Sequence, residues 1–412
     1  MRESAEDIVI VGAGETGARA AAALRENGWA GTVTLVGHEP RAPYERPPLS
    51  KAVMVAAEAP QPPYILSAER LRENDITLLT GCAVTRIDRA AHAVELADGR
   101  RLGYGRLLLA TGCSARRLAV PGADPGRLHY LRTYDDALAL REQLRPDRHV
   151  AIVGGGFIGL ELAASARSRG CGVTLIEAGP RLLMRGVPAD IAAAVAARHQ
   201  AAGVTLKPGV GIERVEPAGT RQVLVLSDGS RVECDGIVVG IGAAPNTELA
   251  AHSGLAIDNG VAVDARLATA DPDIFAAGDC CSFPHPLYDG RRIRLEAWRN
   301  AQDQGALAAR NLLGAGEDYT AVPWFWSDQY ELTLQIAGLP DAGVHTVARP
   351  LGDGVQLNFH LAADGRLVAA SSIGPNAKIA KEIRVAEMLI ARRAQPDANA
   401  LAAPEVKLKS LL

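Results

Sequence analysis

A chain of 412 residues is long enough for two or three domains. Hydrophobic residues make up 48% of it and charged residues 22%, which is ordinary for a globular protein. The formal net charge of −3 argues against nucleic acid as the main partner. No apolar run reaches the roughly 18 residues of a membrane span, and the N-terminus lacks a signal-peptide pattern. We therefore expect a cytoplasmic protein with no nucleic-acid and no membrane partner.

Residues 8–39 open with a pattern that is typical of dinucleotide binding. The strand IVIVGAG leads into an Ala-rich helix and then into the strand TVTLVG. Between the first strand and the helix lies G-x-G-x-x-G, formed by Gly12, Gly14 and Gly17. An acid at the end of the second strand usually binds the adenine ribose. Gly37 occupies that position here, so the predicted ribose ligand is Glu39, two residues further on.

The same pattern returns, more clearly, in residues 150–177. Its three glycines are Gly154, Gly156 and Gly159. The first allows the tight turn, the second lets backbone approach a pyrophosphate, and the third lets helix and strand pack closely. Glu177 ends the second strand, 23 residues after Gly154. The strand, helix, strand and acid together predict a second dinucleotide site.

A second repeat indicates duplication of a whole unit. Residues 94–112 and 223–242 each carry an Asp-Gly hairpin signal between apolar runs, followed by a buried strand that ends in glycine. The later segment 268–283 ends in Gly278–Asp279 and is expected to complete the first unit's sheet. We predict an α/β protein with two nested Rossmann-like dinucleotide-binding domains, glutathione-reductase-like, and a C-terminal α+β domain. The predicted bounds are 1–113 with 243–319, then 114–242, then 320–412.

The cysteines and histidines exclude other chemistry. None of the six cysteines forms C-x-x-C, and residues 18–81 contain none, which argues against a disulfide reductase. The nine histidines are scattered, and neither H-E-x-x-H nor G-x-S-x-G occurs, so we expect no metal site and no hydrolase.

Several motifs resemble the putidaredoxin-reductase-like, FAD-dependent NADH:ferredoxin reductases of bacterial oxygenase systems. The most specific ones are PYERPPLSK (43–51), RLEAWRNAQDQG (294–305) and PWFWSDQ (323–329). LLLATG (107–112), GGGFIGLE (154–161) and FAAGDC (275–280) also match. The resemblance implies that electrons pass from NADH through FAD to a [2Fe–2S] ferredoxin that supplies a cytochrome P450 or a ring-hydroxylating dioxygenase. A rubredoxin reductase, or an NADH-sensing flavoprotein similar to apoptosis-inducing factor, is the alternative.

The resemblance also implies roles for individual residues. The first unit would hold FAD and the second NADH, with Glu177 disfavouring a 2′-phosphate. Lys51 and Glu161 would form an ion pair close to flavin N5. The further residues implied at the flavin are Arg46, Thr111, Gly112, Asp279 and Trp298. Without the resemblance, Lys51 reads as a solvated loop lysine, Glu161 as a helix-surface acid and Trp298 as a core aromatic.

The same resemblance implies a transient, electrostatic contact with the ferredoxin. The predicted helix near 376–393 has an apolar stripe and an opposite cationic arc of Lys378, Lys381, Arg384 and Arg392. Such a face suits an acidic partner, although a solvated helix face is the simpler interpretation.

Overall fold

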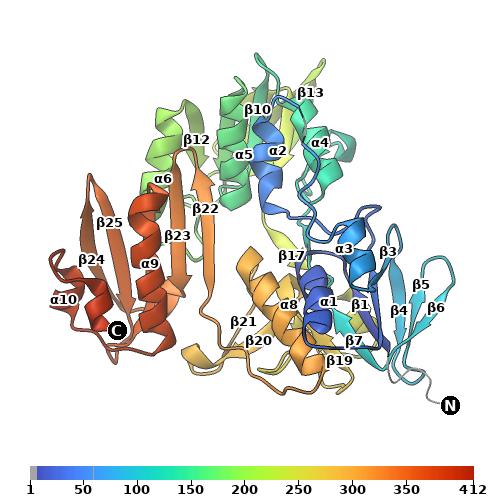
Figure 1. Ribbon diagram of the computed structural model, residues 1–412. Helices are drawn as coiled ribbons and strands as arrows, with labels where there is room; N and C mark the ends of the chain where they lie inside the picture. Colours follow the sequence, from blue (N-terminus) through green and yellow to red (C-terminus); the bar gives the residue numbers. More distant parts are fainter. Residues whose placement is uncertain (1–6, 59) are drawn as a thin grey trace. The chain divides into compact units, whose positions relative to one another are not determined.

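The computed structural model describes residues 7–58 and 60–412 and divides into two compact units (Figure 1). The first unit comprises Met1–Glu45, Pro62–Ser114 and Ala244–Pro323. The second comprises Arg46–Gln61, Ala115–Ala243 and Trp324–Leu412. Each unit contains one of the two glycine motifs, and the second also contains the C-terminal sheet.

The first unit is built on a parallel five-stranded sheet in the order β19-β7-β1-β2-β3. The strands are β1 (Asp7–Val11), β2 (Thr32–Val36), β3 (Thr77–Leu79), β7 (Arg106–Leu109) and β19 (Ile274–Ala276). Helices α1 (Glu15–Glu26) and α8 (Trp298–Leu312) lie side by side in this unit (Figure 1). The pairing of β19 with β7 confirms that a late segment completes the first sheet.

Smaller elements complete the first unit. An antiparallel meander consists of β4 (Val84–Asp88), β5 (Ala93–Leu96) and β6 (Arg101–Gly103), as the Asp-Gly signal predicts. The other strands are β18 (Val261–Ala262), β20 (Cys281–His285) and β21 (Arg291–Ile293). The short helices are α3 (Ala68–Glu73) and α7 (Glu248–His252). Strands β8 (Cys113–Ala115) and β17 (Ala243–Pro245) pair with each other where the chain passes between the units.

The second unit repeats this plan with the sheet order β12-β11-β10-β16-β9. Its strands are β9 (Leu128–His129), β10 (His149–Val153), β11 (Gly172–Glu177), β12 (Val204–Pro208) and β16 (Gly236–Val239). The helices are α4 (Tyr134–Gln143), α5 (Phe157–Ser168) and α6 (Ala189–Ala201). The predicted second meander is present as β13 (Ile212–Ala218), β14 (Arg221–Leu226) and β15 (Arg231–Cys234). It packs its buried Leu224 and Leu226 against Ile237 of β16.

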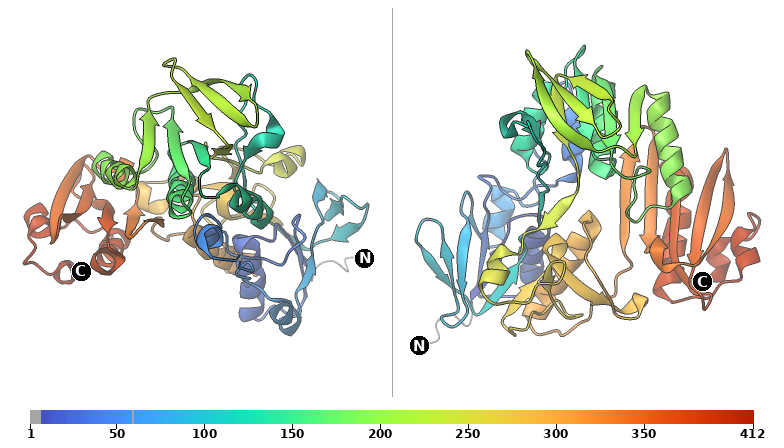
Figure 2. Two further views of the ribbon diagram at one scale, coloured as in Figure 1. Left: turned by 90° about the horizontal axis from the view of Figure 1, so that it is seen from above. Right: turned by 180° about the vertical axis from the view of Figure 1, so that it is seen from behind.

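The C-terminal part is an antiparallel sheet in the order β22-β23-β26-β25-β24, accompanied by α9 and α10 (Figure 2). Its strands are β22 (Trp324–Gln329), β23 (Leu332–Gly338), β24 (His345–Gly352), β25 (Val355–Leu361) and β26 (Leu367–Gly374). Helix α9 (Asn376–Ala391) buries the predicted apolar stripe of Ile379, Ile383, Ala386 and Ile390. Arg349 of β24 donates to the carbonyls of Leu401, Ala403, Pro404 and Val406 and so fixes α10 (Ala398–Ala402) and the residues after it.

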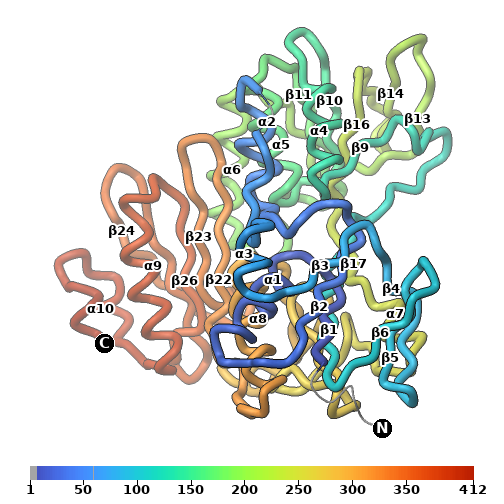
Figure 3. Tube along the Cα trace, turned by 45° about the vertical axis from the view of Figure 1, so that its right-hand side comes forward, coloured from blue at the N-terminus to red at the C-terminus, as the bar shows by residue number. Residues whose placement is uncertain are grey.

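The segment 46–61 belongs to the second unit. It forms a 3₁₀ turn, η1 (Pro47–Ser50), and the short helix α2 (Ala52–Val55), which lies near α4 and α5 in the trace of Figure 3. Arg141 of α4 donates to the carbonyls of Val53 and Met54 at 2.7 and 3.1 Å. Arg169, just after α5, donates to the Met54 carbonyl at 3.0 Å. These two guanidinium groups fix the backbone that follows Lys51.

Candidate active site

The motif of the second unit has the backbone shape that a dinucleotide requires. Gly154 has φ +108°, and a Cβ there would lie 2.3 Å from the Gly240 carbonyl oxygen. A Cβ at Gly159 would lie 2.1 Å from the Gly154 carbonyl oxygen. At Gly156, by contrast, a Cβ would meet nothing within 4 Å. The first and third glycines are thus demanded by the fold itself, whereas the second is next to open space, where a pyrophosphate can approach the helix N-terminus.

The motif of the first unit repeats this arrangement. Gly12 has φ +116°, and its Cβ would lie 2.1 Å from the Ala110 carbonyl oxygen. A Cβ at Gly17 would lie 1.9 Å from the Gly12 carbonyl oxygen, while one at Gly14 would meet nothing within 4 Å. Both motifs therefore fit a dinucleotide, and the two helix N-termini are equivalent binding positions.

The two acids that are predicted to bind ribose occupy different positions for a steric reason. Glu177 accepts hydrogen bonds from the backbone N–H groups of Gly155 at 2.7 Å and Gly179 at 2.6 Å. In the first unit, Ala13 takes the place of Gly155, and a Cβ at Gly37 would lie 2.7 Å from the Ala13 Cβ. A side chain at Gly37 is therefore excluded.

The predicted first-unit acid, Glu39, lies beyond that crowded position. Its carboxylate accepts a hydrogen bond from the Tyr44 hydroxyl, a contact that the sequence did not reveal. The displacement of the acid by two residues is thus a consequence of the side chain at Ala13.

The Asp279 turn lies against the first motif. A Cβ at Gly278 would lie 2.2 Å from Thr16 Oγ1 in the first turn of α1, so the acid that follows is brought to the start of that helix. The Gly278 N–H donates to Gln304 of α8 at 2.7 Å, and the Cys113 thiol donates to Asp279 at 3.3 Å. Sequence reasoning did not single out Gln304, although it lies within the RLEAWRNAQDQG motif.

Asn246 is a further residue whose role was missed. Its side-chain amide donates to the Thr111 backbone carbonyl at 2.8 Å, and its backbone carbonyl accepts from the Thr111 hydroxyl at 2.7 Å. Its N–H donates to the Gly112 carbonyl at 2.9 Å, and Gly112 has φ +66°. Asn246 thus holds the two predicted cofactor residues, Thr111 and Gly112, in one conformation.

Trp298 begins α8, and Gln302, about one turn further along that helix, contacts the first turn of α1. Gln302 donates to Glu15 at 3.0 Å. Burial raises the pKa of Glu15, while the hydrogen bond from Gln302 opposes that shift. A carboxyl that resists ionisation therefore lies in the first turn of the helix that carries Gly14, a feature that the sequence did not predict.

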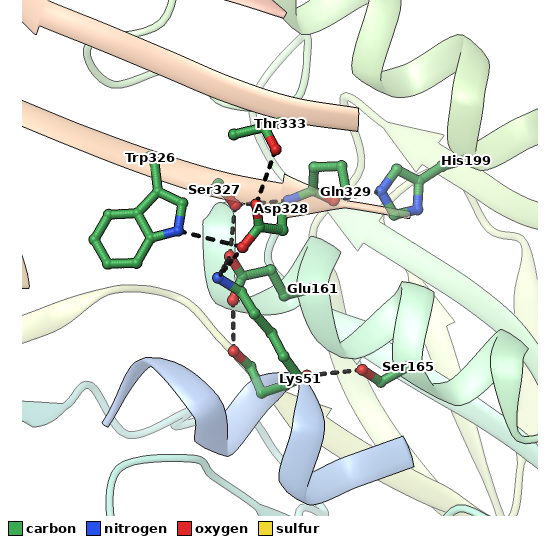
Figure 4. Close-up of polar contacts among 10 residues, drawn as sticks. Lys51, Glu161, Ser165, His199, Trp326, Ser327, Asp328, Gln329 and Thr333 are labelled. Atoms are coloured by element: carbon green, nitrogen blue, oxygen red, sulfur yellow. Dashed lines mark hydrogen bonds and ion pairs between the residues drawn. The ribbon is translucent and has the colours of Figure 1, made fainter. Parts of the chain in front are cut away.

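Lys51 and Glu161 lie together in the second unit, joined by a third charged group (Figure 4). Lys51 Nζ is 3.5 Å from Glu161 Oε1 but 2.9 Å from Asp328 Oδ2 of β22. The indole N–H of Trp326 also donates to Asp328 Oδ2, at 3.2 Å, and the Thr333 hydroxyl donates to Oδ1 at 3.1 Å. Lys51 is thus neither a solvated loop lysine nor the partner of Glu161 alone.

Glu161 is a buried carboxyl within a chain of hydrogen bonds (Figure 4). Its Oε1 accepts from the Ser327 hydroxyl at 2.6 Å, and its Oε2 accepts from the Ser50 hydroxyl. Gln329 Nε2 donates to Ser327 Oγ at 2.9 Å, so Gln329 Oε1 must accept from His199 Nε2, also at 2.9 Å. Burial raises the pKa of Glu161, while Lys51 and the two hydroxyl donors oppose that shift. The helix-surface interpretation of Glu161 is therefore wrong.

The remaining candidates are in less specialised surroundings. Arg46 donates to the Arg132 carbonyl at 2.5 Å within the second unit. All six cysteines are buried thiols. On α9, Lys378 pairs with Asp353 and Arg384 donates to Glu387 at 2.9 Å. Arg392, just after the helix, donates to the Leu412 carbonyl. Three of the four cations in the predicted docking arc are thus already engaged.

Neither a metal cluster nor a membrane-spanning helix is found in the described part of the chain. Residues 7–58 and 60–412 contain no group of three or more His, Cys, Asp or Glu side chains arranged to hold a metal ion. Within the same ranges, every helix is too short or too polar to cross a membrane.

Known proteins resemble this chain over nearly its whole length. Residues 6–305 match the pyridine nucleotide-disulphide oxidoreductase family, and residues 324–412 match the reductase C-terminal family. The chain is 43% identical to the ferredoxin–NAD(+) reductase component of the anthranilate 1,2-dioxygenase system of Burkholderia cepacia, over 99% of this chain and 100% of the relative. It is 36% identical to putidaredoxin reductase of Pseudomonas putida, over 99% of this chain and 97% of that protein. The crystal structure of the covalent putidaredoxin reductase–putidaredoxin complex superimposes with a TM-score of 0.92 at 35% identity, covering 98% of this chain and 97% of that one.

The fold and the two glycine motifs define an oxidoreductase with two dinucleotide sites. The chain belongs to the pyridine nucleotide-disulphide oxidoreductase family, and within it to the ferredoxin–NAD(+) reductases. The predicted fold class and enzyme class are confirmed, and FAD and NAD(H) are the cofactors that this family uses. The named relatives favour a ferredoxin acceptor over the rubredoxin-reductase and sensor alternatives.

Proposed function

We propose that the chain takes electrons from NADH, bound at the second glycine motif, and delivers them to a [2Fe–2S] ferredoxin of a cytochrome P450 or ring-hydroxylating dioxygenase system. The observation that carries this proposal is the matched pair of motifs in which Gly14 and Gly156 are next to open space while the flanking glycines are closed by backbone. FAD, when bound, supplies the chemistry that joins a two-electron donor to a one-electron acceptor. The whole process belongs in the cytoplasm, where NADH is available.

We assign the flavin to the first motif and the pyridine nucleotide to the second. Glu39 and Glu177 would bind the two adenine riboses, and Asp279 would bind the ribityl chain. Thr111 and Gly112, fixed by Asn246, and the backbone at Trp298 would line the flavin. Arg46 would neutralise pyrophosphate charge.

The charged group at Lys51 and Glu161 would orient and stabilise the reacting ring system. Glu161 is nearly inaccessible, with 7% of its side chain exposed, while Lys51 retains 24%. An ammonium that is partly accessible but held by nearby carboxylates can stabilise negative charge that accumulates beside it during reduction. The buried Glu161 carboxylate lies 3.5 Å from that ammonium and attracts it.

This role predicts that Lys51→Met slows flavin reduction by NADH while FAD stays bound. We expect about a tenfold loss in the stopped-flow rate, which corresponds to roughly 1.4 kcal/mol of lost transition-state stabilisation. Lys378→Met is the matched control, because Lys378 also pairs with an aspartate but lies on α9. A Lys51→Met reduction rate equal to that of wild type would show that Lys51 has no part in the reaction.

A further inference from the structure

The closest carboxylate to the Lys51 ammonium is not the one that sequence reasoning names. Asp328 Oδ2 lies 2.9 Å from Lys51 Nζ, and Glu161 Oε1 lies 3.5 Å away. The first distance is that of a charge-assisted hydrogen bond, whereas the second is an ion pair without one. Lys51 therefore donates to the C-terminal sheet and only approaches α5.

Lys51 does not hydrogen-bond to Glu161 because both oxygens of that carboxylate have other donors. Each of its two oxygens accepts a hydroxyl hydrogen bond, one from Ser327 and one from Ser50. Ser327 cannot turn its proton elsewhere, because Gln329 Nε2 donates to its oxygen and its one proton then points to Glu161. Because both oxygens of the buried Glu161 carboxylate accept a hydrogen bond from a hydroxyl group, the carboxylate is stabilised by the nearby charge of Lys51 without a hydrogen bond from its N–H groups.

The Asp328 carboxylate is held in position by hydrogen bonds from residues of β22 and β23. It faces Thr333 across β22 and β23, and the Thr333 hydroxyl donates to Oδ1 at 3.1 Å. The Trp326 indole N–H donates to Oδ2 at 3.2 Å, and Lys51 Nζ lies 5.3 Å from the centroid of the Trp326 ring. The position of the carboxylate is thus set before Lys51 reaches it, although 43% of its side chain is exposed.

We infer that Asp328 is a positioning residue, supplied by the C-terminal domain, which fixes the Lys51 ammonium and shares its charge with Glu161. This inference rests on the proposed function, in that Lys51 acts beside the flavin. Two carboxylates then face one ammonium, and one of them comes from the C-terminal domain.

The direction in which the flavin midpoint potential changes distinguishes this role from a general loosening of the fold. Asp328→Asn keeps the shape of the side chain and an oxygen acceptor but removes a negative charge, so the bound flavin should become easier to reduce and its midpoint potential more positive. Lys51→Met removes a positive charge and should move the potential in the negative direction. Loosening of the fold would move both variants the same way.

The second readout does not depend on the flavin reaction. Lys51 is partly exposed, so an amine-acylating reagent applied to the FAD-loaded protein can reach it, and peptide mass spectrometry reports its rate of modification. Asp328→Asn should raise the acylation rate of Lys51 about two- to fivefold, the size expected when a part-exposed ion pair is lost. Asp328→Glu should restore the wild-type rate. In the Asp328 variants, Lys378 provides the internal reference peptide. Asp353→Asn, which removes the partner of Lys378 instead, is the matched control variant and should leave the acylation rate of Lys51 unchanged.

The outcomes are distinct. A Lys51→Met shift without any effect of Asp328→Asn on potential or on Lys51 acylation would overturn the inference and leave the proposed function intact. Shifts of both variants in the same direction would overturn the inference as well. If Lys51→Met leaves the potential unchanged, the proposed role of Lys51 fails, and the acylation rate alone decides whether Asp328 positions the ammonium.

Discussion

Replacing Gly156 by alanine should separate nucleotide binding from folding. Its backbone, with φ −83° and ψ −177°, suits any residue, and an added Cβ meets no atom within 4 Å. Alanine reduces the freedom of the unfolded chain but is a poorer helix N-cap than glycine, so the two effects offset each other and stability should stay within about 1 kcal/mol of wild type. The added methyl group does, however, occupy the space that a pyrophosphate needs.

The expected loss of affinity follows from the hydrogen bonds at the N-terminus of α5. Preventing one charge-assisted N–H to phosphate bond costs about 1.5–3 kcal/mol, which raises the dissociation constant for NADH by roughly 10- to 150-fold. The NADH dependence of anaerobic flavin reduction, followed by stopped flow, measures this change. Flavin absorbance should be unaffected, because the first motif, to which we assign the flavin, is intact.

Gly159→Ala is the matched control. Its Cβ would lie 2.1 Å from the Gly154 carbonyl oxygen, a backbone atom that cannot move aside, so this variant should unfold at a lower temperature than wild type. The reasoning is refuted if Gly156→Ala binds NADH as tightly as wild type does, or if it loses as much thermal stability as Gly159→Ala.

Two further predictions concern charge and pH. Glu177→Ala should raise kcat/KM for NADPH relative to NADH by about tenfold, because repulsion between the Glu177 carboxylate and a 2′-phosphate near the protein surface is worth 1 kcal/mol or more. Glu177→Gln keeps the shape of the side chain as a control. An unchanged ratio of kcat/KM for the two nucleotides removes Glu177 from the ribose site. Burial lowers the pKa of His360 from 6.5 to about 4. The unfolded chain therefore takes up this proton first, and stability is lost as pH falls from about 6.5 to about 4. Between pH 7 and pH 5 the loss amounts to about 2 kcal/mol. Urea unfolding at pH 7 and at pH 5 should show a smaller loss of unfolding free energy for His360→Gln than for wild type. An equal loss in the two proteins would contradict a lowered pKa for His360.

The parts of the fold that the sequence predicts well are those fixed by backbone geometry. Gly12 and Gly154 have positive φ and carbonyl oxygens next to their Cα atoms, so only glycine fits and the motif is visible in the letters. The two Asp-Gly hairpins are recognisable for the same reason. Strand β19 is recognisable because its apolar run has to be buried, and it pairs with β7 in the first sheet.

What the sequence could not predict depends on side chains that are distant along the chain. Asp328 meets Lys51 across 277 residues, and nothing near either residue marks the other as its partner. The placement of Arg46–Gln61 with the second unit depends on Arg141 and Arg169, which cap its carbonyls. Lys378, Lys381 and Arg384 of the predicted cationic arc lie on α9, but Asp353, which engages Lys378, comes from the turn between β24 and β25.

The division of the chain into units has a consequence for its synthesis. The path passes from one unit to the other after Glu45, Gln61, Ser114, Ala243 and Pro323, so neither unit is a continuous stretch. While the ribosome makes the residues between β7 and β19, one edge of the first sheet has no neighbouring strand, and such an edge is a template for pairing with other chains. At roughly 5–20 residues per second, this exposure lasts about 10–30 seconds. A nascent chain stalled in that interval, or a fragment ending before Ile274, should therefore aggregate even though it carries the complete first glycine motif.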